Sequence, residues 1–240
     1  MDYKEVDFEG EETLKAIANA NKFNAWMYQT IQGYCEGDIL EIGSGIGNIS
    51  KYFIADKKSI TLSDIRAQYR DFLMEAEETK SAPTIEMDIV DPDFSTKYAQ
   101  YHQKFNAVFA LNVVEHVKED QTAIKNLLSL LKPGGKLIIL VPAYAALFNS
   151  FDVELMHYKR YTRSNLKAIM LQKNSELIKS FYFNFAGIFG WFIVGGLLKK
   201  KIIPSENMRL YNTLVPIFKL VDRCIFNLAG LSVVCVVRKK

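Results

Sequence analysis

The chain has 240 residues, enough for one sizeable α/β domain with an elaboration or for two small domains. Its net charge of +3 does not indicate an electrostatic nucleic-acid binder, and we expect no nucleic-acid partner. Three widely spaced cysteines argue against a disulfide framework or a cysteine zinc site. The acidic N-terminus lacks the apolar core of a signal peptide, so we expect a cytoplasmic protein.

Helix-like and strand-like segments alternate along the chain. Apolar residues recur at helical spacing from Glu11 to Tyr34, which predicts one N-terminal helix. Short apolar runs predict strands over 38–42, 59–64, 84–88, 105–112 and 136–142, separated by helices over 48–55, 65–79 and 120–131. The alternation predicts a parallel sheet with helices on both faces. Two more strands are expected over 176–183 and 231–240, and a helix over 164–171 with Thr162 or Ser164 as its N-cap.

Polar residues stand at the ends of four of the predicted strands: Glu41, Asp64, Asp88 and Asn112. In a doubly wound sheet the ligand lies at the carboxyl ends of the strands, near the switch in strand order. All four residues are therefore expected on the ligand side of the sheet. A polar sheet edge without a ligand would account for one such residue more readily than for four.

A glycine-rich turn, GSGIGN, follows the first predicted strand. Gly43, Gly45 and Gly47 allow positive backbone dihedrals and a close ligand, but Asn48 stands where a dinucleotide fingerprint has its third glycine. Glu41 precedes the turn, and its carboxylate would repel a pyrophosphate and suit a ligand with a positive amino group. A nicotinamide-dependent oxidoreductase is thus the weaker alternative.

The two acids that follow extend this interpretation. Asp64 lies about 20 residues after the turn, at a strand end where a carboxylate accepts from the hydroxyls of a ribose. Asp88 is placed to accept from the exocyclic amine of an adenine. A ligand with an amino-acid end, a ribose and an adenine, but no phosphate, is S-adenosylmethionine.

The stretches LEIGSGIGNIS, LSDI, EMDIVD, ALNVVEHVKED and LLKPGGKLIILVP occur in this order between Gly37 and Pro142. Together they resemble the class I S-adenosylmethionine-dependent methyltransferases. The resemblance implies a doubly wound, mostly parallel seven-stranded sheet with S-adenosylmethionine as cofactor. It implies cofactor contacts from Glu41, Gly43, Ser44, Gly45, Asp64, Ile65, Asp88, Ile89 and Asn112. Trp26, in the stretch KFNAW, is expected to close over the cofactor, unless its helix only packs on the domain.

The stretch NVVEHVKED offers one candidate for acceptor chemistry. If a helical turn follows Asn112, then Asn112, Glu115 and His116 share one face. The stretch resembles a segment of quinone-pathway O-methyltransferases in which Glu-x-x-Glu-His holds a divalent metal. Asn112 replaces the first glutamate, which removes an anionic ligand, so no metal is predicted. His116 is expected to act as a base or to orient the substrate, and the alternative is a polar rim that shapes the pocket.

The second candidate is SFDVELMHYKRYTRSNL, which follows the fifth strand and should reach the mouth of the site. Asp152, His157, Arg160 and Tyr161 gather there. His157 has a suitable intrinsic pKa for a base, and Arg160 with the basic residues at 159 and 163 would clamp a phosphate or carboxylate. Alternatively these side chains only tie a loop to the next helix. The stretch resembles an HyrRYt segment in a bacterial methyltransferase subset associated with polysaccharide or lipid-linked glycan pathways.

An apolar insertion over 187–231 separates the last two strands. The stretch 181–198 is close to the shortest membrane span, although Asn184 and four glycines weaken a helical span. Helical spacing from Leu210 to Leu228 is expected to be broken at Pro216. The insertion is interpreted as a lid over the substrate pocket, as a surface that touches membrane or a lipid substrate beside Lys199 to Lys201, or as a dimer interface.

The sequence therefore predicts one methyltransferase domain over 1–240. It comprises a helical segment over 1–36, a cofactor-binding core over 37–186 and a lid over 187–231. The predicted reaction is methyl transfer to an oxygen of a small-molecule, lipid-linked or saccharide acceptor. A non-catalytic, membrane-peripheral protein that binds the cofactor is the alternative outside enzymes.

Overall fold

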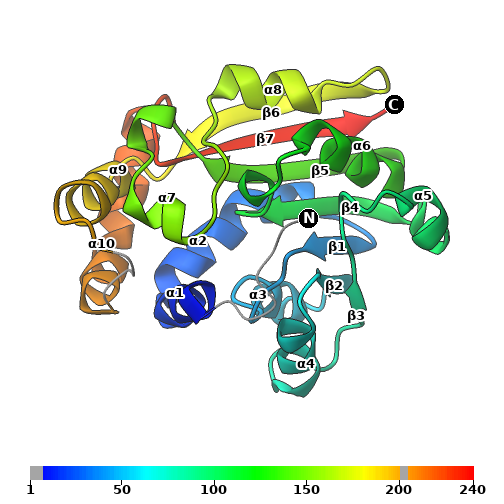
Figure 1. Ribbon diagram of the computed structural model, residues 1–240, viewed down its shortest axis with the longest axis horizontal. Coiled ribbons are helices and arrows are strands. Elements are labelled where there is room, and N and C mark those ends of the chain that lie inside the picture. Colours follow the sequence, from blue (N-terminus) through cyan, green and yellow to red (C-terminus); the bar gives the residue numbers. More distant parts are fainter. Residues whose placement is uncertain (1–7, 201–204) are drawn as a thin grey trace.

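The computed structural model describes residues 8–200 and 205–240, and a seven-stranded sheet runs through its centre (Figure 1). The strand order is β3-β2-β1-β4-β5-β7-β6, and only β7 runs antiparallel to its neighbours. The strands are β1 (Ile39–Ile42), β2 (Ile60–Asp64), β3 (Thr84–Glu86), β4 (Phe105–Leu111), β5 (Leu131–Pro142), β6 (Ser175–Phe183) and β7 (Ser232–Lys239). The predicted doubly wound, mostly parallel sheet is confirmed.

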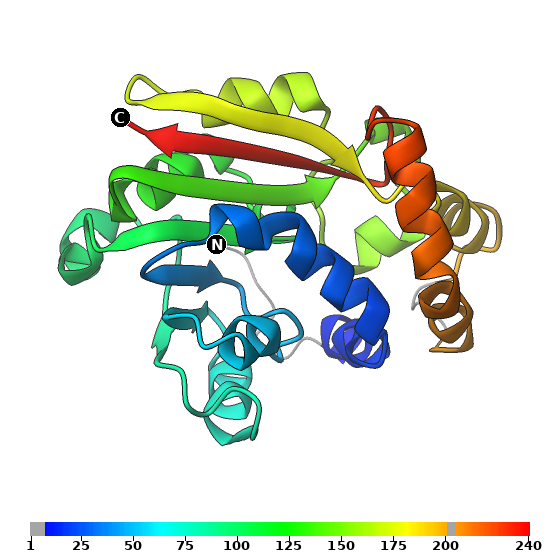
Figure 2. The same cartoon turned by 180° about the vertical axis from the view of Figure 1, so that it is seen from behind.

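Both faces of the sheet are covered, because side chains alternate along each strand. On β1, Leu40 and Ile42 belong to one apolar cluster and Ile39 to the other. The first face carries α5 (Phe94–Lys97), α6 (Asp120–Leu130) and α8 (Arg163–Met170). The opposite face, seen in Figure 2, carries α2 (Asn21–Ile31), α3 (Ser50–Ala55) and α4 (Ala67–Glu75). The expected N-cap of α8 is present, since Thr162 accepts from Asn165 N.

The insertion begins at the ligand side of the sheet because of the strand directions. Since β7 is antiparallel to both β5 and β6, β6 runs parallel to β5 and ends at the same edge. The chain then forms α9 (Gly187–Trp191), the short π-helix η5 (Phe192–Leu197) and α10 (Ser205–Cys224). α10 packs on α1 (Phe8–Ala18) and α2, and η5 packs on α7 (Ser150–Glu154) (Figures 1 and 2).

Two helix predictions were wrong in detail. The single N-terminal helix is two helices, α1 and α2, because the chain turns at Asn19 and Ala20 and the Asn24 side chain donates to Ile17 O at 2.9 Å. Pro216 does not break the second half of the insertion. It lies inside α10, where a proline removes one main-chain hydrogen bond without ending the helix, and Val215 beside it is buried.

The stretch considered as a membrane span has a different structure. Its first residues, 181–183, are the end of β6, and the rest forms α9 and η5. Across residues 8–200 and 205–240, every helix is too short or too polar to cross a bilayer. The third predicted strand is also shorter than expected, because β3 ends at Glu86 and Asp88 lies just beyond it.

Candidate active site

A cavity of about 450 Å³ opens at the carboxyl ends of β1, β2 and β4. Nine of the ten predicted cofactor residues line it: Glu41, Gly43, Ser44, Gly45, Asp64, Ile65, Asp88, Ile89 and Asn112. Side chains from α2 and from the insertion complete its wall. The topology therefore brings together residues that lie up to 71 positions apart in the chain (41 to 112).

The glycine turn forms the floor of the cavity in a backbone conformation that favours glycine. Gly43 and Gly45 have φ angles of 68° and 54°. A Cβ on Gly43 would stand 2.5 Å from Cγ2 of Val113, so a side chain there would also clash with Val113. The two glycines keep the backbone bare where a ligand is expected to approach.

Asn48 ties the turn to the N-terminal helix, a role that the sequence analysis missed. Its Nδ2 donates to Leu14 O on α1 at 3.0 Å. The side chain of Leu14 lies 3.0 Å from the position that a Cβ on Gly45 would take. The residue that departs from the dinucleotide fingerprint thus holds α1 across the glycine turn, and α1 adds to the cavity wall through Leu14 and Ile17.

Glu41 is a buried acid at the end of β1, with 4% of its surface exposed. The hydroxyl of Ser50 donates to its carboxylate. Burial raises the pKa of Glu41 to about 7; hydrogen bonds from Ser50 and Ser44 lower it, and the nearby charge of Asp64 raises it further. A cationic group of a ligand would stabilise the charged form of this carboxylate.

Asp64 ends β2 and is held by two main-chain amides. Its Oδ2 accepts from Gly45 N at 3.0 Å, and its Oδ1 accepts from Arg66 N at 2.9 Å. Burial raises the pKa of Asp64, and the two amide hydrogen bonds oppose that change. The carboxylate is fixed in orientation at the cavity wall, as recognition of neighbouring hydroxyls requires.

The residues present fit S-adenosylmethionine better than a dinucleotide. Buried carboxylates at Glu41 and Asp64 are acceptors suited to an amino group and to hydroxyls, and they would repel phosphates. The apolar side chains Ile65 and Ile89 line the cavity near Asp88, as an adenine ring would require. The individual contacts stay predictions.

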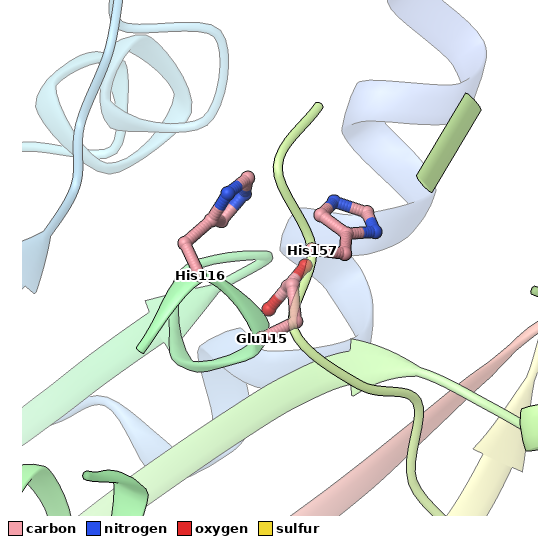
Figure 3. Close-up of side chains that lie close together, drawn as sticks. All are labelled: Glu115, His116 and His157. Atoms are coloured by element: carbon pink, nitrogen blue, oxygen red, sulfur yellow. The ribbon is translucent and has the colours of Figure 1, made fainter. Parts of the chain in front are cut away.

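The acceptor candidates lie in the same cavity, on two segments that face each other. His116 follows β4 in a 3₁₀ turn, η3 (Val114–His116), and His157 lies on the segment after α7, as Figure 3 shows. Their ring centroids are 4.7 Å apart, with an angle of 81° between the ring planes. The expected turn after Asn112 is therefore present, but its partner across the cavity, His157, comes from 41 residues later in the chain (116 to 157).

Glu115 is fully buried beneath the two rings, and neither of its carboxylate oxygens has a hydrogen-bond partner among the described residues. Burial raises the pKa of Glu115 to about 8, with Arg160 lowering it in part. Burial also lowers the pKa of His116, and the neighbouring His157 lowers it further. His116 is therefore a neutral imidazole at neutral pH.

Known methyltransferases match this chain over most of its length. A family model described as a methyltransferase domain matches residues 12–180, which is well over half of the chain. The chain belongs to this methyltransferase family. S-adenosylmethionine is its methyl donor, in agreement with the buried carboxylates Glu41 and Asp64 that line the cavity. When bound, the cofactor supplies an electrophilic methyl group, and the nicotinamide-dependent alternative loses its support.

Solved structures share the fold at low identity. A chain of the complex between the Haloferax volcanii Trm112 methyltransferase activator and its methyltransferase aligns with a TM-score of 0.60, 13% identity, and coverage of 96% of this chain and 94% of that one. A SAM-dependent methyltransferase from Archaeoglobus fulgidus aligns with a TM-score of 0.53 and 17% identity, and the alignment covers 90% of this chain and 94% of that one. The Haemonchus contortus phosphoethanolamine N-methyltransferase 2 aligns with a TM-score of 0.55 and 18% identity, and the alignment covers 85% of this chain and 49% of that one. These likenesses concern the fold.

Arg160 of this methyltransferase is buried and lines the cavity. Its Nε donates to Asp152 Oδ1 at 2.8 Å and its Nη1 to Ala143 O at 3.0 Å, while Nη2 has no partner among the described residues. The guanidinium lies 4.7 Å from the centroid of the Trp191 ring. The other members of the predicted basic clamp are elsewhere: Lys159 pairs with Asp120 at 2.6 Å, and Arg163 is exposed outside the cavity lining.

Two predicted site residues of the methyltransferase lie outside the cavity wall. Tyr161 is buried in the core under α6, where its hydroxyl donates to Asp120 at 3.0 Å, so we assign it to packing rather than to chemistry. Trp26 packs on Phe183 of β6, with ring centroids 4.4 Å apart. Its neighbour Phe23 lines the cavity instead, so the KFNAW stretch closes the site through another residue.

Proposed function

We propose that this methyltransferase transfers the methyl group of S-adenosylmethionine to an oxygen of a small or lipid-linked acceptor. The observation that carries the proposal is the shared cavity. Glu41 and Asp64 line its cofactor end, and His116 and His157 face each other in the same space. In-line transfer requires the methyl donor and the acceptor oxygen to be held together, and one shared cavity provides room for both.

Oxygen is favoured as the acceptor because of the state of His157. Burial opposes ionisation of Asp152, but hydrogen bonds from His157 and Arg160 outweigh it and lower the pKa of that carboxyl. Nδ1 of His157, at 2.8 Å, is therefore assigned as a donor to the ionised Asp152, and in the neutral form of the ring the lone pair is then on Nε2. A lone pair held in this way suits an acceptor hydroxyl that must lose its proton.

The lipid-linked class of acceptor is supported by the insertion. Trp191 and Val194 on one side and Met208 and Tyr211 on the other line the cavity. The remaining faces of α9, η5, α10 and the loop after α10 expose large apolar side chains: Phe189, Phe192, Ile193, Leu197, Leu198, Leu210, Ile217, Leu220, Phe226 and Leu228. We call these ten residues the exposed apolar surface. One segment thus presents apolar side chains both to the cavity and to solvent, as extraction of an apolar acceptor would require.

The charges beside the exposed apolar surface fit an anionic lipid bilayer. Among the described residues of 187–231 the exposed charged side chains are four bases and one acid: Lys199, Lys200, Arg209, Arg223 and Glu206. Lys201 lies outside the described residues. Bases beside exposed aromatic and aliphatic side chains are typical of segments that lie on a membrane surface. A lipid-linked saccharide, the acceptor class suggested by the HyrRYt resemblance, agrees with this surface.

The proposal is tested by finding the acceptor. Soluble and membrane fractions of a cell extract are incubated with the protein and with S-adenosylmethionine that carries a labelled methyl group, and labelled products are identified by mass spectrometry. We expect a labelled, O-methylated product in the membrane fraction, and its loss with Asp64→Ala. A product methylated on nitrogen or carbon would refute the oxygen assignment, and a water-soluble product would refute the lipid-linked class.

A further inference from the structure

The side chains of Glu115, His116 and His157 point into one space from two segments of the chain (Figure 3). One ligand-capable atom from each lies within 4.8 Å of the other two. From this geometry we propose that Glu115, His116 and His157 bind a divalent transition-metal cation. The sequence prediction of no metal considered the turn after β4 alone, and the third donor comes from the segment after α7.

The strongest evidence is the carboxylate. Glu115 is fully buried, and neither of its oxygens has a hydrogen-bond partner in the described part of the chain. A buried carboxylate without a partner is unfavourable unless something compensates it. Arg160 stabilises the ionised form of Glu115 in part through its charge, but no hydrogen bond joins the two side chains, and its Nε and Nη1 donate to Asp152 and Ala143. A cation between the carboxylate and the two rings would provide the missing partner.

Both histidines are oriented as metal ligands usually are. Ligating imidazoles generally donate their second ring nitrogen to a carboxylate or a main-chain carbonyl, which fixes the tautomer and the ring plane. His157 uses Nδ1 for Asp152 at 2.8 Å, and His116 has a hydrogen bond with the backbone of Leu155. Each ring therefore has one nitrogen occupied by the protein and one left for a ligand.

The charge and the spacing of the group also suit a cation. Asp152 and Arg160 neutralise each other, so a cation that displaces the proton of Glu115 would be balanced by the carboxylate it binds. Ligand atoms around a tetrahedral zinc at about 2.1 Å are roughly 3.4 Å apart. Starting from 4.8 Å or less, the three atoms reach that spacing by movements of about 1 Å each, within the range of side-chain rotation.

Two imidazoles and one carboxylate are donors that Zn²⁺, Fe²⁺ and Co²⁺ accept, with one or more positions left open. An acceptor oxygen bound at an open position would lose its proton more readily, because the cation stabilises the anion. This role, unlike the binding itself, rests on the proposed methyl transfer. With a metal bound, the lone pair of His157 Nε2 would act on the acceptor oxygen through the cation instead of taking its proton directly.

The test measures metal binding directly, with Zn²⁺ as the probe. The full-length protein is stripped with a chelator, and Zn²⁺ affinity and stoichiometry are measured by calorimetry, with the visible absorption of Co²⁺ as a second readout. We expect about one equivalent of Zn²⁺ per chain, and an affinity lowered at least about 100-fold by His116→Gln or His157→Gln. Asp152→Asn, which changes the partner of the second ring nitrogen of His157 and of Arg160 but no proposed ligand, is expected to lower the affinity about 10- to 100-fold.

The chain has three histidines, and the third provides the matched control. His102 follows α5 and is absent from the cavity lining, so His102→Gln should bind Zn²⁺ as the wild type does. Calorimetry with S-adenosylmethionine verifies that each variant is folded. If the wild type binds no Zn²⁺, or if all three histidine variants bind it equally, the metal site is refuted. Methyl transfer by the chelated protein would refute only the role of the metal in the reaction, whereas Zn²⁺ binding without any methylated oxygen would refute only the proposed function.

Discussion

Glu41 gives the sharpest prediction, because its buried charge is expected to have two opposite effects. It destabilises the ligand-free protein and strengthens cofactor binding. Only 4% of its surface is exposed, and burial raises its pKa from an ordinary value of 4.5 to about 7. That difference corresponds to about 3 kcal/mol between the protonated and ionised forms. Glu41→Gln keeps the size of the side chain and an oxygen that accepts from Ser50, and it removes the charge.

The direction follows from the sign of the change. The folded protein holds the proton of Glu41 more tightly than the unfolded chain does. This group therefore contributes stability that is fully present below pH 4.5 and is lost as the pH rises through about 7. Above pH 7 the ligand-free wild type bears the full cost of a buried carboxylate, and Glu41→Gln does not.

Urea unfolding without cofactor measures the effect. We expect Glu41→Gln to be more stable than the wild type by up to about 3 kcal/mol at pH 8 and by much less at pH 5. The exposed acid Glu36 gives the matched control, since Glu36→Gln should change stability little at either pH. A Glu41→Gln protein that is less stable than the wild type at pH 8, or a difference that does not vary with pH, would refute the reasoning.

Cofactor binding should change in the opposite direction. Ionised Glu41 is expected to attract the amino group of S-adenosylmethionine, so Glu41→Gln should bind it more weakly. For one group with a pKa of about 7, the ionised fraction rises about tenfold between pH 6 and pH 8. The ratio of wild-type to variant affinity should rise by up to that factor in calorimetry, while titration of the ligand cancels in the ratio. A constant ratio would contradict contact between this acid and the amino group.

Three further outcomes are expected. Asp64→Ala should weaken S-adenosylmethionine binding by about 1–3 kcal/mol in calorimetry, through loss of charged hydrogen bonds, and unchanged binding would contradict the ribose assignment. Tyr161→Phe removes the hydrogen bond to Asp120 and should cost about 1 kcal/mol in urea unfolding, with methyl transfer intact; a selective loss of activity would return Tyr161 to the site. Phe189→Ser with Leu197→Ser should reduce co-sedimentation with anionic liposomes, and wild-type protein that stays in the supernatant would remove the membrane proposal.

The cofactor end of the site is predictable because local sequence patterns encode it. Each strand of a parallel sheet ends at the same edge, so the strand order of the fold and the chemistry of Glu41 and Asp64 are enough to place a cofactor. The strands and most helices follow for the same reason, since periodicity reports which faces are buried. The two exceptions differ in cause: the break before Asn21 is a local turn closed by the Asn24 side chain, whereas the uninterrupted α10 around Pro216 packs on helices far apart in the chain.

The acceptor end is decided by tertiary structure. Local spacing in the sequence puts Glu115 beside His116 and puts His157 near Arg160. It does not show that His157 lies across the cavity from His116. The distance between the two histidines depends on how the segment after β5 folds back. Nor does local spacing show that Tyr161 turns into the core while Arg160 faces the site, since the two are adjacent in sequence. The sequence by itself determined the fold and the methyl donor. Only the packed structure showed a buried, unpaired carboxylate beneath two oriented imidazoles.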